Sequence, residues 1–160
     1  MKTLVAYASR HGTAEKIAHL ISLELEHCQV RLLDLKHENP RFDLAEYENV
    51  IVGGSIHYGE IQNVVKDFCN KYHHELMQKG LGLFLCYMRD EVAKKEFDHA
   101  FPESLQNHAK ALGYFGGEIL FEKMNLVERF VVSTVGKKTE NEFHVDEEAI
   151  GSFILKMNQV

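Results

Sequence analysis

The sequence lacks the features of several protein classes. It has only three cysteines, Cys28, Cys69 and Cys86, which are widely spaced inside apolar runs and form no metal-ligand pair. An odd, scattered set of this kind predicts reduced thiols in an intracellular protein rather than a disulfide framework. No apolar run approaches the roughly 18 residues of a membrane span, and the N-terminal run is too short for a signal peptide. We therefore expect a cytoplasmic protein with no integral membrane segment.

Basic charge is also scarce. Lysine and arginine number 18 against 24 acidic residues, the formal net charge is -6, and no basic run is longer than a pair. This balance argues against nucleic acid or an anionic membrane as the main partner. The chain of 160 residues is about the size of one domain, and its 45% apolar content is enough for a core. The sequence predicts one domain over residues 1–160, without repeats or low-complexity segments.

Short apolar runs alternate with helical patterns along the chain. Because parallel strands need crossover connections, this alternation favours a doubly wound α/β fold with helices on both faces of the sheet. It predicts a five-stranded parallel sheet in the order 2-1-3-4-5. The near-continuous apolar character of the runs is typical of strands that are covered on both faces. The predicted strands are residues 3–8, 29–35, 49–55, 81–87 and 114–121.

Helices are expected between and after these strands. The first is predicted from residue 13 to residue 28 by apolar residues at helical spacing. A second is marked by apolar residues over 65–76 and should stop near Gly80. Pro102 should split the next helical region into one helix around 91–100 and one over 103–112, which Gly113 ends. Asp146 is a candidate cap for the last helix, whose predicted inner face is Ala149, Ile150, Phe153, Ile154 and Met157. An extra helical segment is predicted at about 122–139, with its helix over 125–135 packing one face on the domain.

The loop after the first strand, "SRHGT", has a composition suited to an anion. It offers the hydroxyls of Ser9 and Thr13, a flexible Gly12 and a run of backbone amides that leads into a helix. A helix N-terminus favours negative charge, and in such a sheet ligands bind beyond the carboxyl ends of the strands beside strands one and three. The loop therefore predicts a phosphate site.

Two further loops should lie at the same edge of the sheet. Glycines surround Tyr58 in the loop after strand three, which lets backbone approach a flat ring while the tyrosine stacks on it. The loop after strand four adds Tyr87, Met88, Arg89 and Asp90. One phosphate site beside one flat-ring site predicts a mononucleotide cofactor.

The stretches "YASRHGTAEKIA" and "VIVGGSIHYGE" resemble the flavodoxin-like family, and within it the branch that contains menaquinone-dependent protoporphyrinogen oxidase. The resemblance covers essentially the whole chain, including "NLVERFVVSTVGKK", which is similar to an insert of that branch. For this segment the resemblance implies a second role, which is to shape a substrate mouth or to touch a membrane surface. It implies FMN as cofactor. It departs at Ala14, where the family's phosphate loop usually ends in a threonine hydroxyl; Thr13, one residue earlier, is the nearest substitute.

The resemblance also implies the residues of the cofactor site. In this family a peptide beside a glycine can turn to hydrogen-bond the reduced flavin, and the peptide between Tyr58 and Gly59 is the matching place. Implied at the phosphate are Ser9, Arg10, His11, Gly12, Thr13 and Ala14, and around the isoalloxazine ring Ser55, Ile56, His57, Tyr58, Gly59, Cys86, Tyr87, Met88, Arg89 and Asp90.

Ordinary structural roles compete with these assignments. No residue outside the cofactor loops forms an obvious acid and base pair, so no catalytic residue is predicted. His73 and His74 are adjacent and cannot make the i, i+4 pair of a helical metal site, so no metal is expected. The competing roles are helix capping for Ser9 and Thr13, a surface position for Tyr58 and His57, core packing for Cys86, and a surface ion pair between Arg89 and Asp90.

The sequence thus favours an FMN-binding redox protein. It leaves open a carrier between redox partner proteins or an oxidoreductase acting on a porphyrinogen with a quinone as acceptor, and it leaves the oligomeric state open. A flavin-free binding module is the alternative, supported by Ala14. A signalling receiver is excluded because Ala8, Ser9, Gly54 and Ser55 stand where the acidic residues would be needed. The first loop lacks the G-x-G-x-x-G motif of a nicotinamide-binding half-domain, and it lacks the G-K-[ST] motif of a nucleotide triphosphatase. Both classes are therefore disfavoured.

Overall fold

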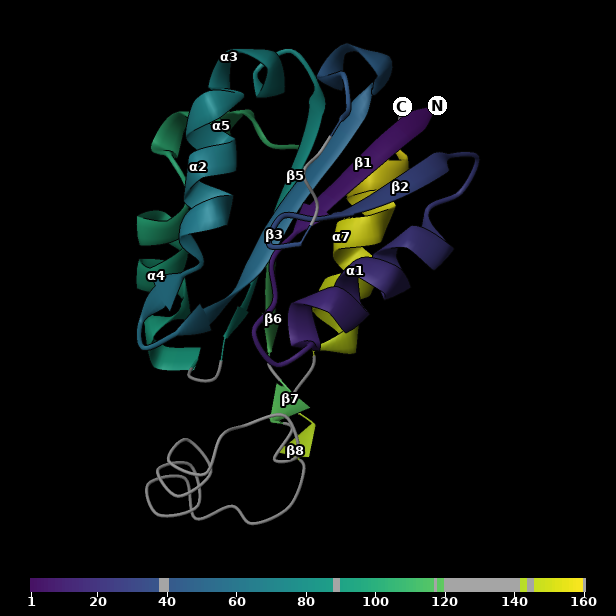
Figure 1. The fold of residues 1–160 in the computed structure, drawn as a ribbon. Helices are drawn as coiled ribbons and strands as arrows, with labels where there is room; N and C mark the ends of the chain where they lie inside the picture. The colour runs from purple at the N-terminus through teal and green to yellow at the C-terminus, as the bar shows by residue number, and fades with distance from the viewer. Residues whose placement is uncertain (38–40, 88–89, 117, 120–141, 144–145, 160) are drawn as a thin grey trace.

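The computed structural model describes residues 1–37, 41–87, 90–116, 118–119, 142–143 and 146–159. A parallel sheet in the order β2-β1-β3-β5-β6 runs through its centre (Figure 1). This is the predicted order, with β5 and β6 as the fourth and fifth parallel strands, so the predicted fold class is confirmed. The strands are β1 (Lys2–Tyr7), β2 (Gln29–Asp34), β3 (Asn49–His57), β5 (Gly80–Tyr87) and β6 (Ala111–Gly116), and the short β4 (Glu60–Ile61) pairs antiparallel with β3.

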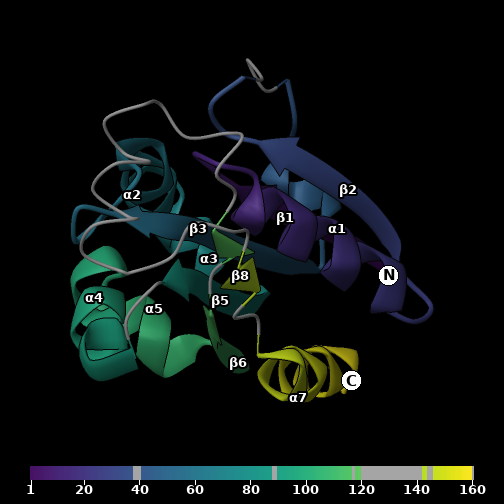
Figure 2. The same cartoon turned by 90° about the horizontal axis from the view of Figure 1, so that it is seen from below.

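Helices cover both faces of the sheet, as Figures 1 and 2 show from two directions. One face carries α1 (Thr13–Glu24) and α7 (Glu147–Asn158). The other carries α2 (Asn63–Lys71), α3 (His73–Leu76), α4 (Ala93–Ala100) and α5 (Glu103–His108). The remaining short elements are the 3-10 turns η1 (Leu44–Glu46) and η2 (Asp90–Val92) and the antiparallel pair β7 (Glu118–Ile119) and β8 (Glu142–Phe143).

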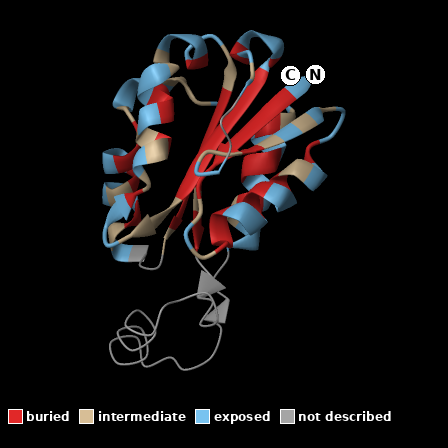
Figure 3. Ribbon diagram, in the orientation of Figure 1, coloured by how far each residue is buried: buried red, intermediate tan, exposed pale blue. Residues whose placement is uncertain are grey.

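Alternate residues of the central strands supply two separate cores. In β1, Leu4 and Ala6 belong to the cluster under α2, α4 and α5, whereas Val5 and Tyr7 belong to the cluster under α1 and α7. The middle of the sheet is buried on both sides (Figure 3). Because both faces of these strands need apolar side chains, the sequence shows continuous apolar runs instead of alternation.

Two predicted helix signals are confirmed. The Asp146 carboxylate accepts a hydrogen bond from the Ala149 amide at 2.9 Å, which caps α7. Pro102 stands between α4 and α5, where its fixed backbone ends one helix and begins the next. The predicted inner face of α7 is also borne out: Ile150, Phe153, Ile154 and Met157 are buried, and Ala149 packs beside them.

Several predicted boundaries are wrong. The first helix ends at Glu24 because Leu25 is extended. The helix predicted over 65–76 is interrupted at Tyr72, whose ring packs on Phe68 with centroids 4.9 Å apart. The helix predicted up to residue 112 ends at His108, and Gly113 lies inside β6 instead of closing a helix, since parallel pairing with β5 begins at Ala111. The extra segment at about 122–139, with its helix over 125–135, lies outside the described residues.

Candidate functional site

The loop between β1 and α1 is shaped by Gly12. This residue is the N-cap of α1 and has a φ of 93°, a left-handed conformation that glycine adopts without strain. Its amide donates to Ser9 Oγ at 2.9 Å, so the serine closes the loop instead of capping the helix. A glycine cap has no side-chain oxygen to offer to the first-turn amides of α1. The loop therefore directs backbone amides and a helix N-terminus at one small region.

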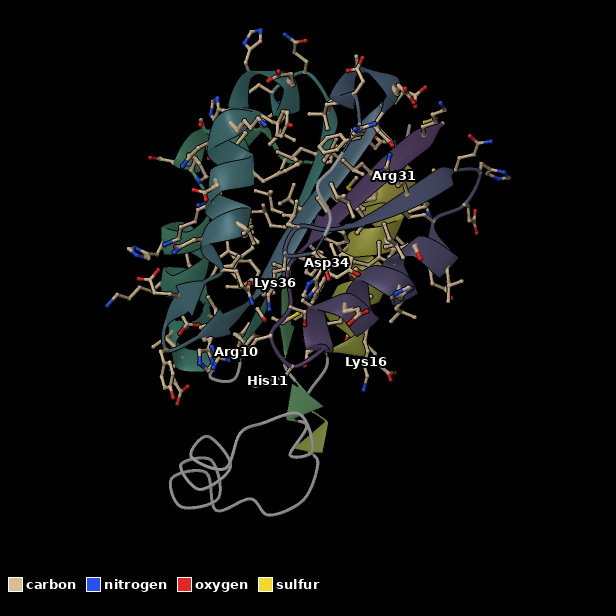
Figure 4. The ribbon with its side chains drawn as sticks, in the orientation of Figure 1. Arg10, His11, Lys16, Arg31, Asp34 and Lys36 are labelled. Atoms are coloured by element: carbon tan, nitrogen blue, oxygen red, sulfur yellow. The ribbon has the colours of Figure 1, made fainter. Side chains whose placement is uncertain are left out.

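Thr13 and Ala14, the last two predicted residues of this loop, are buried. Thr13 is the first residue of α1 and is 7% exposed, and Ala14 is fully buried in the cluster under α1 and α7. A hydroxyl at position 14 would thus be set against apolar neighbours, which makes alanine compatible with the fold there. Arg10 is exposed and His11 is partly buried, and both lie at the carboxyl end of the sheet (Figure 4).

The loop predicted after strand three is in fact a tight hairpin. Ile56 and His57 continue β3, pair with Ile61 and Glu60 of β4, and leave only Tyr58 and Gly59 in the turn. These two residues have φ angles of 50° and 77°, the signs required for a type I′ turn. The prediction that Ile56 and His57 lie in a loop is therefore wrong. They are the last residues of β3, directly before the turn.

Gln62 fixes the base of this hairpin. Its Oε1 accepts from the Ser55 amide at 3.2 Å and its Nε2 donates to Ser55 Oγ at 2.8 Å. The Ser55 hydroxyl is thus held by the protein itself. At the tip, Tyr58 is 77% exposed and meets the His57 ring edge-on with centroids 4.2 Å apart. Sequence reasoning missed Gln62 because its role depends on β4 folding back on β3.

The third predicted loop begins at the end of β5. Cys86 and Tyr87 are its last strand residues, and Ser55 of β3 lies opposite Cys86 in the sheet. Met88 and Arg89 lie outside the described residues, and Asp90 begins η2. The Arg89–Asp90 ion pair therefore stays a prediction. Cys86 is 2% exposed among apolar side chains, which matches its competing reading as a core residue.

Thiol reactivity should separate the three cysteines. Burial raises the pKa of the Cys69 thiol to about 12 and raises that of Cys86 further, so neither forms thiolate at neutral pH. Cys28 is only partly buried. We expect a thiol reagent at pH 8 to label Cys28 rapidly in the folded protein and the other two only after unfolding. Cys28→Ser should remove the rapid phase; rapid labelling of Cys86 would instead show that the end of β5 is open to solvent.

The first two loops meet at one end of the sheet. The His11 and His57 rings lie edge to face with centroids 6.0 Å apart, which joins the loop after β1 to the hairpin after β3. The strands below them are in direct register, with Tyr7 opposite Gly53. This is the switch point of the sheet, where the connection from β1 goes to one side and that from β3 to the other.

A pocket of about 800 Å³ opens between the hairpin and α4. Glu60 forms part of its wall and is held by Lys66 Nζ at 2.6 Å and by His99 Nε2 at 3.1 Å. The hydrogen bond from Lys66 is the main reason that the pKa of the Glu60 carboxyl is lowered, and His99 adds to the effect. The sequence alone does not indicate this pocket, although Lys95 and His99 of its α4 wall are four residues apart and so share one face of the helix. Its lining residues are Ile56, Tyr58, Gly59, Glu60, Val92, Lys95, Glu96, Asp98 and His99.

Within the described ranges, no group of three or more histidine, cysteine or acidic side chains is arranged to hold a metal ion. His73 and His74 instead face separate neighbours, Ser104 Oγ at 2.7 Å and Gln78 Nε2 at 3.0 Å. In the same part of the chain no helix has the length and apolar character needed to cross a membrane.

The sequence matches the family described as "Flavodoxin domain" over residues 4–146. Two curated relatives are both called protoporphyrinogen IX dehydrogenase [quinone]. The protein from Leishmania major is 23% identical over 158 residues, which cover 93% of this chain and 68% of that protein. The protein from Escherichia coli K12 is 22% identical over 163 residues, which cover 94% of this chain and 87% of that protein.

The fold is also similar to that of a solved flavodoxin from Streptococcus pneumoniae TIGR4. The TM-score is 0.57 at 16% sequence identity, and the alignment covers 99% of this chain and 97% of the flavodoxin. At this identity the likeness concerns the fold alone. It agrees with the strand order and with the placement of helices on both faces.

Proposed function

This chain belongs to the flavodoxin domain family, and from that premise we propose that it binds FMN and acts as a redox protein. One observation carries the proposal: a loop suited to phosphate and a hairpin suited to a flat ring meet at the switch point through His11 and His57. A mononucleotide needs both features within a short distance. The same edge of the sheet offers both.

The donors at the first loop fit a phosphate group. The amides that begin α1 receive no side-chain oxygen from the Gly12 cap, and the helix dipole favours an anion there. Ser9 keeps the loop closed through the Gly12 amide, and the exposed Arg10 adds positive charge. We propose that residues 9–14 bind the phosphate mainly through backbone amides, with Thr13 providing the hydroxyl that Ala14 lacks.

The hairpin fits one side of a flavin ring. A Cβ placed on Gly59 would meet no atom within 4 Å, so the backbone there can be approached closely by a ligand. Tyr58 presents its ring at the turn and is available for stacking. When bound, FMN would supply a ring that accepts and releases electrons. The chain's own part would be to orient that ring with the Tyr58–Gly59 turn and with the end of β5.

We further propose that the protein is an oxidoreductase that acts on small molecules, and not an electron carrier that serves only other proteins. The pocket beside Tyr58 supports this choice, because it has room for an organic molecule next to the hairpin. The names of both relatives suggest a porphyrinogen as donor and a quinone as acceptor. In that reaction the donor loses electrons and protons in pairs, and each quinone gains two of each to become a quinol. The exposed Lys95 in the pocket wall could hydrogen-bond an acidic group or a carbonyl oxygen of such a molecule.

Flavin retention tests the first step of this proposal. The protein is purified, mixed with excess FMN and passed through a desalting column, after which its visible spectrum is recorded and the released cofactor is identified by chromatography. We expect retained FMN at close to one per chain. A folded but colourless protein would contradict the proposal and favour the flavin-free binding module.

Reduction experiments then distinguish an enzyme from a carrier. Under anaerobic conditions a porphyrinogen should bleach the flavin absorption, and a quinone should restore it. Bleaching only by a flavodoxin reductase, with no response to small donors or quinones, would favour a carrier between redox proteins.

A further inference from the structure

Lys36 lies in the turn that follows β2 and makes a hydrogen bond to the loop between β1 and α1. Its Nζ donates to the Ser9 carbonyl at 3.0 Å across 27 residues of sequence. Asp34 fixes the turn, since its Oδ1 accepts from the Lys36 amide at 2.9 Å and its carbonyl accepts from the His37 amide at 3.3 Å. Figure 4 shows Asp34 and Lys36 beside one another and close to the loop that carries Arg10 and His11. The end of β2 thus supports the candidate phosphate loop.

This hydrogen bond continues the strand pairing beyond the ends of β1 and β2. The Tyr7 carbonyl accepts from the Leu35 amide at 2.8 Å, on the β2 side, and the Ala8 amide donates to the Gly53 carbonyl at 3.2 Å, on the β3 side. Backbone groups along a strand repeat every two residues, so the Ser9 carbonyl again faces the β2 side. There the Lys36 ammonium takes the place of a backbone donor.

The orientation of the next amide follows from peptide geometry. In a planar trans peptide the carbonyl and the following N–H point in opposite directions. With the Ser9 carbonyl held toward β2, the Arg10 amide N–H faces the β3 side, where the switch point and the hairpin lie. Lys36 therefore keeps a backbone donor directed at the crevice and places a positive charge behind the loop.

We propose that Lys36 is a positioning residue for the phosphate group of the bound cofactor. The inference rests on the proposed binding of FMN and extends it to a residue outside the family-like loops. Lys36 holds the Ser9–Arg10 peptide so that its N–H faces the phosphate, and its ammonium offsets part of the negative charge. Removing it should affect ligands that carry the phosphate and spare those that lack it.

The test compares FMN with riboflavin, which has the same ring and no phosphate. Lys36→Met keeps the apolar stem and removes both donor and charge, whereas Lys36→Arg keeps both. Lys110→Met is a matched control, because Lys110 also donates to a backbone carbonyl, that of Gln159 at 3.4 Å, but precedes β6 at the opposite end of the sheet. Dissociation constants are measured by flavin fluorescence at low and high salt, with melting temperatures as a check on folding.

We expect Lys36→Met to weaken FMN binding about tenfold, the effect of one charged hydrogen bond, and to change riboflavin binding by less than about twofold. The loss should shrink at high salt, and Lys36→Arg should recover most of the affinity. Equal losses for FMN and riboflavin would overturn the inference, as would an FMN affinity equal to that of Lys110→Met. If the wild-type protein binds neither flavin, the proposed function fails first and this inference fails with it.

Discussion

Replacing Thr13 by glutamate should lower the affinity for FMN at least 100-fold without unfolding the protein. Thr13 is the first residue of α1 and is 7% exposed, so a carboxylate there would lie beside the proposed phosphate in a poorly solvated position. Like charges held together at such a site cost several kcal/mol, and about 3 kcal/mol corresponds to roughly 100-fold. The helix itself tolerates the change, because an acidic residue in the first turn interacts favourably with the dipole.

Two comparisons isolate the effect of charge. Thr13→Gln has nearly the same shape as Thr13→Glu and no charge, so it should lose far less FMN affinity. Riboflavin, which has no phosphate, should distinguish the two variants only weakly. Dissociation constants from fluorescence titration check these expectations, and circular dichroism checks the fold. Equal losses in the two variants would mean that crowding, not the phosphate, explains the result; unchanged FMN affinity in Thr13→Glu would remove the loop as the phosphate site.

The arrangement of the sheet could be predicted because its signals are local and redundant. The run ending at Tyr7 and the run beginning at Asn49 are apolar on both faces, and each is separated from the next by a segment of helical period. Right-handed crossovers then leave few possible strand orders. The edge at which the candidate loops gather follows from the order alone, so the approximate place of the site needed no knowledge of side-chain contacts.

The hairpin could not be predicted because its turn uses an unusual pair of residues. Type I′ turns are signalled by Asn-Gly or Asp-Gly, whereas here Tyr58 takes the first left-handed position at a φ of 50°. A tyrosine pays a conformational cost there that asparagine would not. The glycines around it indicated a loop instead. A strained aromatic residue at the tip of a hairpin is consistent with a role in contacting a ligand.

The start of β6 and the role of Lys36 depend on contacts between distant segments. Ala111 and Leu112 follow a short helix and continue its apolar pattern, so only pairing with β5 identifies them as strand residues. Lys36 reads as one more charged residue in a polar connector. Its bond to Ser9 exists because β1 and β2 are neighbours in the sheet, a fact of tertiary structure.

Adding one methyl group at Gly53 should destabilise the protein by about 3 kcal/mol, near the upper end of what overpacking usually costs. Gly53 lies in β3 opposite Phe84 of β5, and a Cβ there would overlap the Phe84 ring at Cε1. The ring has little room to move: it is fully buried and stacks on Phe115 with centroids 5.7 Å apart, and Phe115 meets Phe153 of α7 at 5.5 Å. The methyl group must therefore displace either β3 or this row of rings.

Urea unfolding of four variants tests the prediction and its cause. Gly53→Ala should lower the midpoint strongly, and the double variant Gly53→Ala with Phe84→Leu should be more stable than the sum of the two single changes predicts. Gly151→Ala makes the same chemical change on the exposed side of α7, where nothing lies within 4 Å, and should stabilise by about 0.5–1 kcal/mol. If Phe84→Leu does not relieve the loss of stability in Gly53→Ala, the clash does not involve the Phe84 ring. Because β3 continues directly into the hairpin, Phe84→Leu should also restore any FMN affinity that Gly53→Ala loses. Such a recovery would show that packing in the centre of the sheet affects the geometry of the candidate site.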